Sequence, residues 1–301
     1  MKVYSPSQTS TWFRCPMMRA LRKEGWIPRY GQRKDWAAVL GQAFGAGVGA
    51  YNSLRQEHEA QGTPMPERAS EVRASFIEVA VGVALGVKQQ RVREMVDMGL
   101  VVDEDGDAYI KVLDQRIKRA VTCYVLTDPI PDTWKIVGIE ASLGEGAGNA
   151  RPDLVVRDEM GLAVVDYKSK LTLKAEYRHK TIQEYANGHQ FLHYAYFGRE
   201  YYKEPIERYY IGLAVLEPRW AFELIPFPVH DETLKVWYQG ASTAWAMMER
   251  EDTGEQVPWL SDRHSDQFGQ CPYYAACFIH HYDENLMRQN YILTERVTEA
   301  A

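Results

Sequence analysis

The segment RPDLVVRDEMGLAVVDYKSK, residues 151–170, constrains the fold of this chain more than any other stretch. Two short runs rich in valine and leucine flank the turn-forming residues Asp158 to Gly161. This pattern predicts an antiparallel β-hairpin, because apolar β-branched runs form strands and short polar, glycine-containing segments reverse the chain. In the register that a four-residue loop imposes, Asp153 lies directly opposite Asp166.

The predicted register brings two carboxylates and one ammonium group together. Directly opposed residues have Cβ atoms about 4.5–5.5 Å apart, and like charges at that distance are destabilising. Aspartates at both Asp153 and Asp166 therefore call for a cation between them. Side chains alternate along a strand, so Lys168 lies on the same face as Asp166. The hairpin thus predicts a polar site at one end of its strands.

This residue set suits the hydrolysis of a phosphodiester. A Mg²⁺ or Mn²⁺ ion held by carboxylate oxygens neutralises developing charge and makes a bound water nucleophilic near neutral pH. The ammonium of Lys168 can orient that water or stabilise negative charge. The alternative interpretation takes Asp153 and Asp166 as ordinary strand-end residues and Lys168 as a surface ion-pair partner. The Pro-Asp pair, the apolar strands and the register favour the catalytic interpretation.

The remaining sequence predicts an α/β protein with a mixed central sheet flanked by helices and an N-terminal helical region. We expect the first 130 residues to be all-helical, and a core over residues 131–255 to follow. A C-terminal segment over residues 256–301 contains Cys271 and Cys277. The expected helices cover residues 9–23, 35–61, 66–98, a segment after Gly106, 175–202 and 231–251, and the expected strands cover residues 134–141, 153–157, 162–168, 208–216 and 220–225.

Composition and charge limit the class of protein. The 301 residues are 46% hydrophobic and 25% charged, as in ordinary globular proteins. No apolar run approaches the about 20 residues of a membrane span, and the N-terminus does not resemble a signal peptide, so we expect a cytoplasmic protein with no membrane partner. The net charge of −6 argues against a protein that coats nucleic acid by electrostatics alone. It does not argue against a metal-dependent enzyme, because the metal reverses the local charge.

Pro152-Asp153 followed by Asp166-Tyr167-Lys168 resembles the motif of the PD-(D/E)XK nuclease superfamily. Downstream, Gln190 and Tyr194 resemble the Gln-xxx-Tyr motif of its RecB-like branch, and residues four apart share one helix face. The N-terminal SPSQTSTWFRCPMMRAL and the C-terminal CPYYAAC look like segments of RecB-like and CRISPR-associated exonucleases. The resemblance covers nearly the whole chain and implies a restriction-endonuclease-like core.

The resemblance also implies roles for individual residues. Asp153, Asp166 and the backbone carbonyl of Tyr167 would bind Mg²⁺ or Mn²⁺, and Glu140, on the strand before the hairpin, would be a further ligand. Lys168 would assist the attacking water.

Downstream of the hairpin, the resemblance implies that Gln190 and Tyr194 hold the nucleic acid. The alternative is that these two residues form an ordinary polar–aromatic pair on a helix.

Two departures from the family pattern stand out. Many relatives carry a histidine in a Gly-x-x-x-His arrangement on an N-terminal helix, whereas here Gly45 stands four residues after Gly41. Relatives with an iron–sulfur cluster use four cysteines, three of them in a Cys-x-x-Cys-x5-Cys run near the C-terminus.

In this sequence Cys15, Cys271 and Cys277 match three of those positions, and Phe268 occupies the fourth. Because such a cluster is held by four protein ligands, we expect none here. His264 as a substitute ligand and a zinc ion at the thiols are the alternatives.

Two functional hypotheses follow. The first is a Mg²⁺- or Mn²⁺-dependent DNA nuclease, an exonuclease rather than an endonuclease, that acts with recombination, repair or replication proteins; its size suits a phage enzyme in a bacterial host. The second is a catalytically inactive nucleic-acid-binding or scaffold protein on the same fold. The five intact residues of the two motifs favour the first hypothesis.

Overall fold

The computed structural model describes residues 2–28, 32–97, 104–144, 150–186, 188–255, 265–266, 269–270, 273, 276–277, 279 and 282–293. Its N-terminal part is largely helical, as predicted. The helices there are α1 (Pro6–Arg14), α2 (Pro16–Lys23), α3 (Gln32–Ala60), α4 (Glu71–Asp97) and α5 (Glu104–Thr127). A capping box starts α1, because Ser5 accepts from the backbone of Gln8 and Gln8 accepts from the backbone of Ser5.

Two expectations for this part were wrong. The helix predicted over residues 9–23 is interrupted at Cys15, whose backbone is extended because the next residue, Pro16, disfavours a helical conformation before it. The region is also not all-helical, since Trp26–Pro28 forms strand β1. This strand pairs antiparallel with β9 (Tyr291–Leu293) at the other end of the sequence, a partner that no local pattern identifies.

The core is a five-stranded mixed sheet in the order β2-β3-β4-β5-β6. Its strands are β2 (Lys135–Ile139), β3 (Leu154–Asp158), β4 (Gly161–Lys170), β5 (Ile206–Val215) and β6 (Ala221–Pro228). Only the β4–β5 pair is parallel. A parallel pair needs a crossover connection, which α6 (Ala175–Ala186) and α7 (His189–Tyr202) supply. The prediction of a single helix over residues 175–202 was wrong, because two helices cover this segment. Gly188, whose backbone is extended, precedes the second helix.

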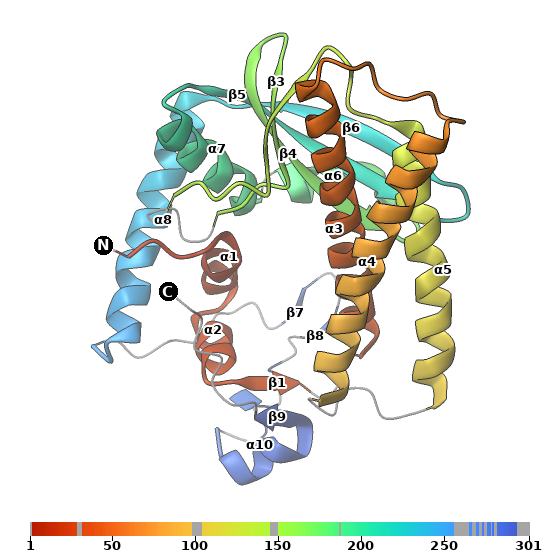
Figure 1. Cartoon of the computed structure of the whole chain (residues 1–301). Coiled ribbons are helices and arrows are strands. Elements are labelled where there is room, and N and C mark those ends of the chain that lie inside the picture. The colour runs from red at the N-terminus through yellow and green to blue at the C-terminus, as the bar shows by residue number, and fades with distance from the viewer. Residues whose placement is uncertain are drawn as a thin grey trace.

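Helices cover both faces of the sheet, and Figure 1 shows α3, α4 and α5 side by side on one flank. Ala163, Val165 and Tyr167 of β4 pack against these three helices. Leu162 and Val164 face the opposite way, towards α7 and α8 (Asp231–Asp252). Odd-numbered residues of β4 thus face α3–α5, and even-numbered residues face α6 and α7.

The C-terminal part contains the short strands β7 (Ser265–Asp266) and β8 (Gly269–Gln270) and the helix α10 (Glu284–Asn290). Helix α10 begins at Asp283, whose side chain accepts a hydrogen bond from the backbone N–H of Leu286. None of the described helices combines the length and the apolar character that a membrane span requires.

Candidate active site

The β3–β4 hairpin has the predicted register. Arg157 pairs with Leu162 and Leu154 pairs with Val165, so the next opposed positions are Asp153 and Asp166. The loop is shorter than predicted, because Asp158 also pairs with Gly161 and leaves only two residues in the turn. This change does not affect the register, since both loop lengths give the same pairs.

Both aspartates lie where their charges interact. Asp166 is 2% exposed on the face of β4 that packs towards α7, and the side chain of Asp153 accepts a hydrogen bond of 2.6 Å from the backbone N–H of Tyr167. Burial and the charge of Asp166 raise the pKa of Asp153 to about 8. Burial also raises the pKa of Asp166, against the opposing effect of Lys168. The two carboxyl groups thus lie close together where water reaches them poorly.

Lys168 connects this pair to α7. Its ammonium forms an ion pair with Asp166 and donates a 2.8 Å hydrogen bond to Oε1 of Gln190. Burial opposes the charged form of Lys168, but Asp166 and Asp153 outweigh that effect and raise its pKa. Gln190 in turn donates from Nε2 to the hydroxyl of Tyr194 at 2.8 Å. A continuous chain of contacts therefore runs from Asp166 to Tyr194.

Tyr167 takes part in this arrangement through its backbone. Its ring faces α3 and α5, where its hydroxyl contacts Asn52 at 3.2 Å and Tyr124 at 2.7 Å. The ring also explains Gly212 on β5, because an added Cβ there would lie 2.5 Å from Cδ1 of Tyr167. A side chain at Gly212 would displace Tyr167, whose N–H holds Asp153. The glycine inside a strand was the available signal for this close approach.

Glu140 lies just beyond β2 and is exposed. Its backbone N–H donates to the carbonyl of Asp153 at 3.2 Å, with φ at +43°. Its Oε1 lies 3.5 Å from where a Cβ of Gly49 on α3 would be. Among the described residues no group of three or more His, Cys, Asp or Glu side chains is placed to hold a metal ion. Glu140 contacts Asp153 through its backbone, and, after burial and the charge of Asp166, its own charge also raises the pKa of Asp153. Its role as a metal ligand stays a prediction.

Asp153 and Asp166 nevertheless suit a hard divalent cation. Carboxylate oxygens are the ligands that Mg²⁺ and Mn²⁺ prefer. Lys168 brings one positive charge to two carboxylates, and burial together with the charge of Asp166 raises the pKa of Asp153. A cation between the acids would favour the ionised form of both. The donor set thus fits such a metal, with the carbonyl of Tyr167 as the predicted third oxygen.

The contact of Tyr185 with Lys168 and Lys170 was not predicted from the sequence. Nζ of Lys170 lies 5.4 Å from the ring centroid of Tyr185 on α6, and Nζ of Lys168 lies 5.8 Å from the same centroid. Strand alternation from Lys168 gave a signal for Lys170. Tyr185 had none, because its approach depends on how α6 packs against β4.

The cysteine region is described only in part. Cys15 is buried in a cluster with Trp26 and Met287, and Cys277 packs against that cluster. Cys271 lies outside the described residues.

Phe268 and His264, the other positions in the cluster hypothesis, also lie outside the described residues. The iron–sulfur and zinc hypotheses therefore stay predictions. On α3, a Cβ added to Gly45 would meet no described residue within 4 Å, so the space next to this position is open among the residues that the structure describes.

Comparison with known families gives one result. A family model described as the PD-(D/E)XK nuclease superfamily matches residues 3–278. The matched range includes the hairpin, α7 and the N-terminal helices. A search of the curated proteins finds no match to the chain.

Proposed function

This chain belongs to the PD-(D/E)XK nuclease superfamily, and we propose that it is a Mg²⁺- or Mn²⁺-dependent deoxyribonuclease. Its mixed five-stranded sheet flanked by helices is consistent with the restriction-endonuclease-like fold. The observation that carries the proposal is the pair of acids, Asp153 and Asp166, which lie one position beyond the last paired residues of the hairpin, with Lys168 against Asp166.

We propose the following roles for the residues of the site. Asp153, Asp166 and the carbonyl of Tyr167 hold the cation, which when bound neutralises phosphoryl charge and lowers the pKa of a water. Lys168 stays protonated beside Asp166, and its ammonium donates a further hydrogen bond to the water or to a phosphoryl oxygen. Gln190 fixes the direction of the Lys168 ammonium, because its side-chain oxygen accepts from Nζ.

Tyr194 in turn fixes Gln190, since its hydroxyl accepts from Nε2. The two α7 residues thus support the site through Lys168. We propose that they also border the path of the DNA strand.

Finer assignments rest on the motifs. The Gln190–Tyr194 pair and the two terminal segments support an exonuclease of the RecB-like, CRISPR-associated type. Such an enzyme would act in the cytoplasm with recombination, repair or replication proteins, and a phage origin fits its size. We propose that residues 131–255 form the nuclease core, with residues 1–130 as a helical region packed on it and residues 256–301 as a C-terminal segment.

A catalytically inactive DNA-binding protein is the second candidate. Gly45 favours it, because the histidine common in relatives is missing and the space beside Gly45 is open. The contacts among Asp166, Lys168 and Gln190 favour an active enzyme instead, since an inactive protein has no need to keep them.

The deciding experiment is cleavage of end-labelled single- and double-stranded DNA by the full chain with Mg²⁺ or Mn²⁺, with Asp166→Asn as the matched variant. We expect cleavage by the wild type and none by the variant, while DNA binding persists in both. DNA binding without cleavage in the wild type would favour the scaffold function. Equal cleavage by both proteins would remove Asp166 from the site.

A further inference from the structure

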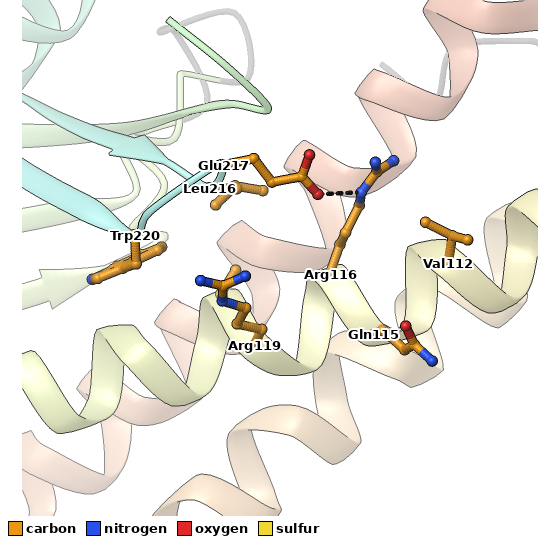
Figure 2. Close-up of a pocket in the computed structure, with 8 residues that line it drawn as sticks. Val112, Gln115, Arg116, Arg119, Leu216, Glu217 and Trp220 are labelled. Carbon is orange, nitrogen blue, oxygen red and sulfur yellow. Dashed lines mark hydrogen bonds and ion pairs between the residues drawn. The ribbon is translucent and has the colours of Figure 1, made fainter.

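A small cleft lies away from the acid pair, between α5 and the turn that joins β5 to β6. Its volume is about 180 Å³, and Figure 2 shows the side chains around it. The cleft is lined by Val112, Gln115, Arg116, Arg119 and Ala120 of α5 and by Leu216, Glu217 and Trp220 of the turn. Because a cavity of about 150 Å³ can hold a benzene ring, the cleft has room for one nucleobase and not for a duplex.

The charged groups of the cleft leave one cation in excess. Nε of Arg116 donates to Glu217 at 2.9 Å, so these two charges neutralise each other. Arg119 is exposed and has no ion-pair partner in the described part of the chain. Figure 2 shows its guanidinium extended towards Trp220. A free guanidinium in this position suits an anionic group with several acceptor oxygens, such as a phosphate.

Trp220 provides a flat aromatic surface beside that guanidinium. Its ring stacks with Phe222, with centroids 6.3 Å apart, and meets the ring of Phe44 at 6.1 Å. These contacts hold the indole in place from the core side. An aromatic ring next to a guanidinium is the combination with which proteins bind single-stranded nucleic acid, since the ring stacks with a base and the cation contacts the backbone.

The cleft adjoins the strand that carries the candidate active site. The backbone N–H of Leu216 donates to the carbonyl of Lys170 at 3.0 Å, and that of Glu217 donates to Leu171 at 2.8 Å. Lys170 is two residues beyond Lys168 on β4. The turn that forms one wall of the cleft is therefore bonded to the end of the catalytic strand.

We propose that this cleft binds one nucleotide of a single-stranded segment of the substrate, outside the place of bond cleavage, with the base against Trp220 and its phosphate on Arg119. The identity of the strand rests on the proposed nuclease function. The cleft would hold an unpaired nucleotide of a strand whose scissile phosphodiester lies several nucleotides away, at Asp153 and Asp166.

The test measures binding of the full chain to fluorescein-labelled oligo(dT) of 4 to 20 nucleotides in EDTA, which prevents metal-dependent cleavage. Arg119→Gln is the test variant. Lys118→Gln is the control, because Lys118 is the exposed neighbour of Arg119 on α5 and does not line the cleft. We expect Arg119→Gln to weaken binding roughly tenfold, as for the loss of one charge-assisted hydrogen bond. The effect should appear only once the oligonucleotide is long enough to reach the cleft.

A second readout is the dependence of the dissociation constant on salt. Loss of one phosphate contact should reduce the slope of log K against log salt by about 0.7 in Arg119→Gln. Trp220→Leu, with its fold checked by circular dichroism, should weaken binding without that change of slope. Equal weakening by Lys118→Gln, or wild-type binding by Arg119→Gln at every length, would overturn the proposal. The proposal would also be wrong if the cleft bound free thymidine monophosphate but no oligonucleotide.

These outcomes are independent of the proposed function. If the wild type fails to cleave DNA but Arg119→Gln weakens strand binding, the nuclease proposal fails and the cleft remains a binding site. If the wild type cleaves and Arg119→Gln binds normally, only the cleft proposal fails.

Discussion

The carboxylate of Asp153 accepts a 2.6 Å hydrogen bond from the backbone N–H of Tyr167. This bond ties the first acid to the strand that carries the second, because Tyr167 directly follows Asp166. The carboxylate of Asp153 is therefore held beside the backbone of the strand that carries Asp166. The carboxylate of Asp166 is held separately, by its ion pair with Lys168.

We predict that the stability of the metal-free protein falls as the pH rises. The pKa of Asp153 is raised from its ordinary value to about 8, so the folded state binds more protons than the unfolded state between about pH 4 and 8. The contribution of the protonated acid is present below pH 4 and lost as the pH passes 8. Thermal unfolding in EDTA at several pH values measures this, and Asp153→Asn should flatten the decline. An unchanged decline in that variant would exclude Asp153 as its source.

Asp153→Asn also tests whether the two acids bind a metal ion. If the acid pair holds a metal as proposed, Mg²⁺ would bind the native protein and not the unfolded chain, so it should raise the melting temperature of the wild type at pH 8. Asp153→Asn should show little or none of this gain. Ca²⁺ and Mg²⁺ can both be tried, but only Mg²⁺ or Mn²⁺ should support cleavage, because the site offers few ligands and Ca²⁺ prefers more. Cleavage that persists in excess EDTA would show that the acids do not work through a metal.

The hairpin was predictable because everything that sets its register is local. Side chains alternate between the two faces of a strand, and the turn is short, so only one pairing of the two strands buries both apolar runs. That pairing places Asp153 opposite Asp166. The contact between Lys168 and Gln190 was not predictable from the same reasoning, since it depends on how α7 crosses over to join β4 and β5. The resemblance indicated both residues, and the packing shows that they touch.

Elsewhere the sequence pattern was ambiguous for physical reasons. The breaks at Gly188 and at extended Cys15 interrupt the helical spacing of apolar residues for only one or two positions. The spacing therefore looks continuous across each break when the sequence alone is read. Strand β1 has three residues and no alternation to detect. The cleft at Arg119 and Trp220 joins residues about a hundred positions apart in the sequence, and only the packing of α5 against the β5–β6 turn reveals it.

We predict that purified protein contains no iron–sulfur cluster. Phe268 stands at one of the four positions that relatives fill with cysteine, and a phenylalanine side chain cannot bind iron. Anaerobically purified protein should lack visible cluster absorbance and contain less than one iron per chain. Phe268→Cys is the informative variant, because it restores the fourth thiol. About four irons per chain in the wild type would show that another residue, such as His264, completes the ligand set.

Gln190 should control activity through Lys168. Gln190→Met has a similar length but cannot accept from Nζ of Lys168, so the ammonium loses this hydrogen bond and keeps its ion pair with Asp166. We expect kcat to fall roughly tenfold to a hundredfold, as for other residues that orient a catalytic group. Tyr194→Phe removes only the acceptor for Gln190 and should have a smaller effect in the same direction. Gln239→Met, at an exposed glutamine of α8, is the control, and a kcat loss as large as that of Gln190→Met would indicate a general effect on folding.

Lys170 should contribute to substrate binding more than to the chemical step. It lies on the same face of β4 as Lys168, and in the described part of the chain it has no carboxylate partner, only the ring of Tyr185 at 5.4 Å. A cation on the same strand face as Lys168, beyond it from the acid pair, suits a phosphate of the substrate near the cleaved bond. Lys170→Gln should therefore raise KM severalfold, change kcat much less, and reduce the salt dependence of binding.

Tyr185 allows a finer test of the same idea. Tyr185→Phe keeps the aromatic face and should leave KM near that of the wild type, whereas Tyr185→Leu removes it and should raise KM about threefold, as for loss of an exposed cation–π contact. Lys180→Gln, at an exposed lysine of α6, controls for the loss of a general positive charge. Steady-state kinetics on a short labelled strand measure all four variants. If Lys180→Gln raises KM as much as Lys170→Gln does, the effect of Lys170 is one of net charge and not of its place beside Tyr185.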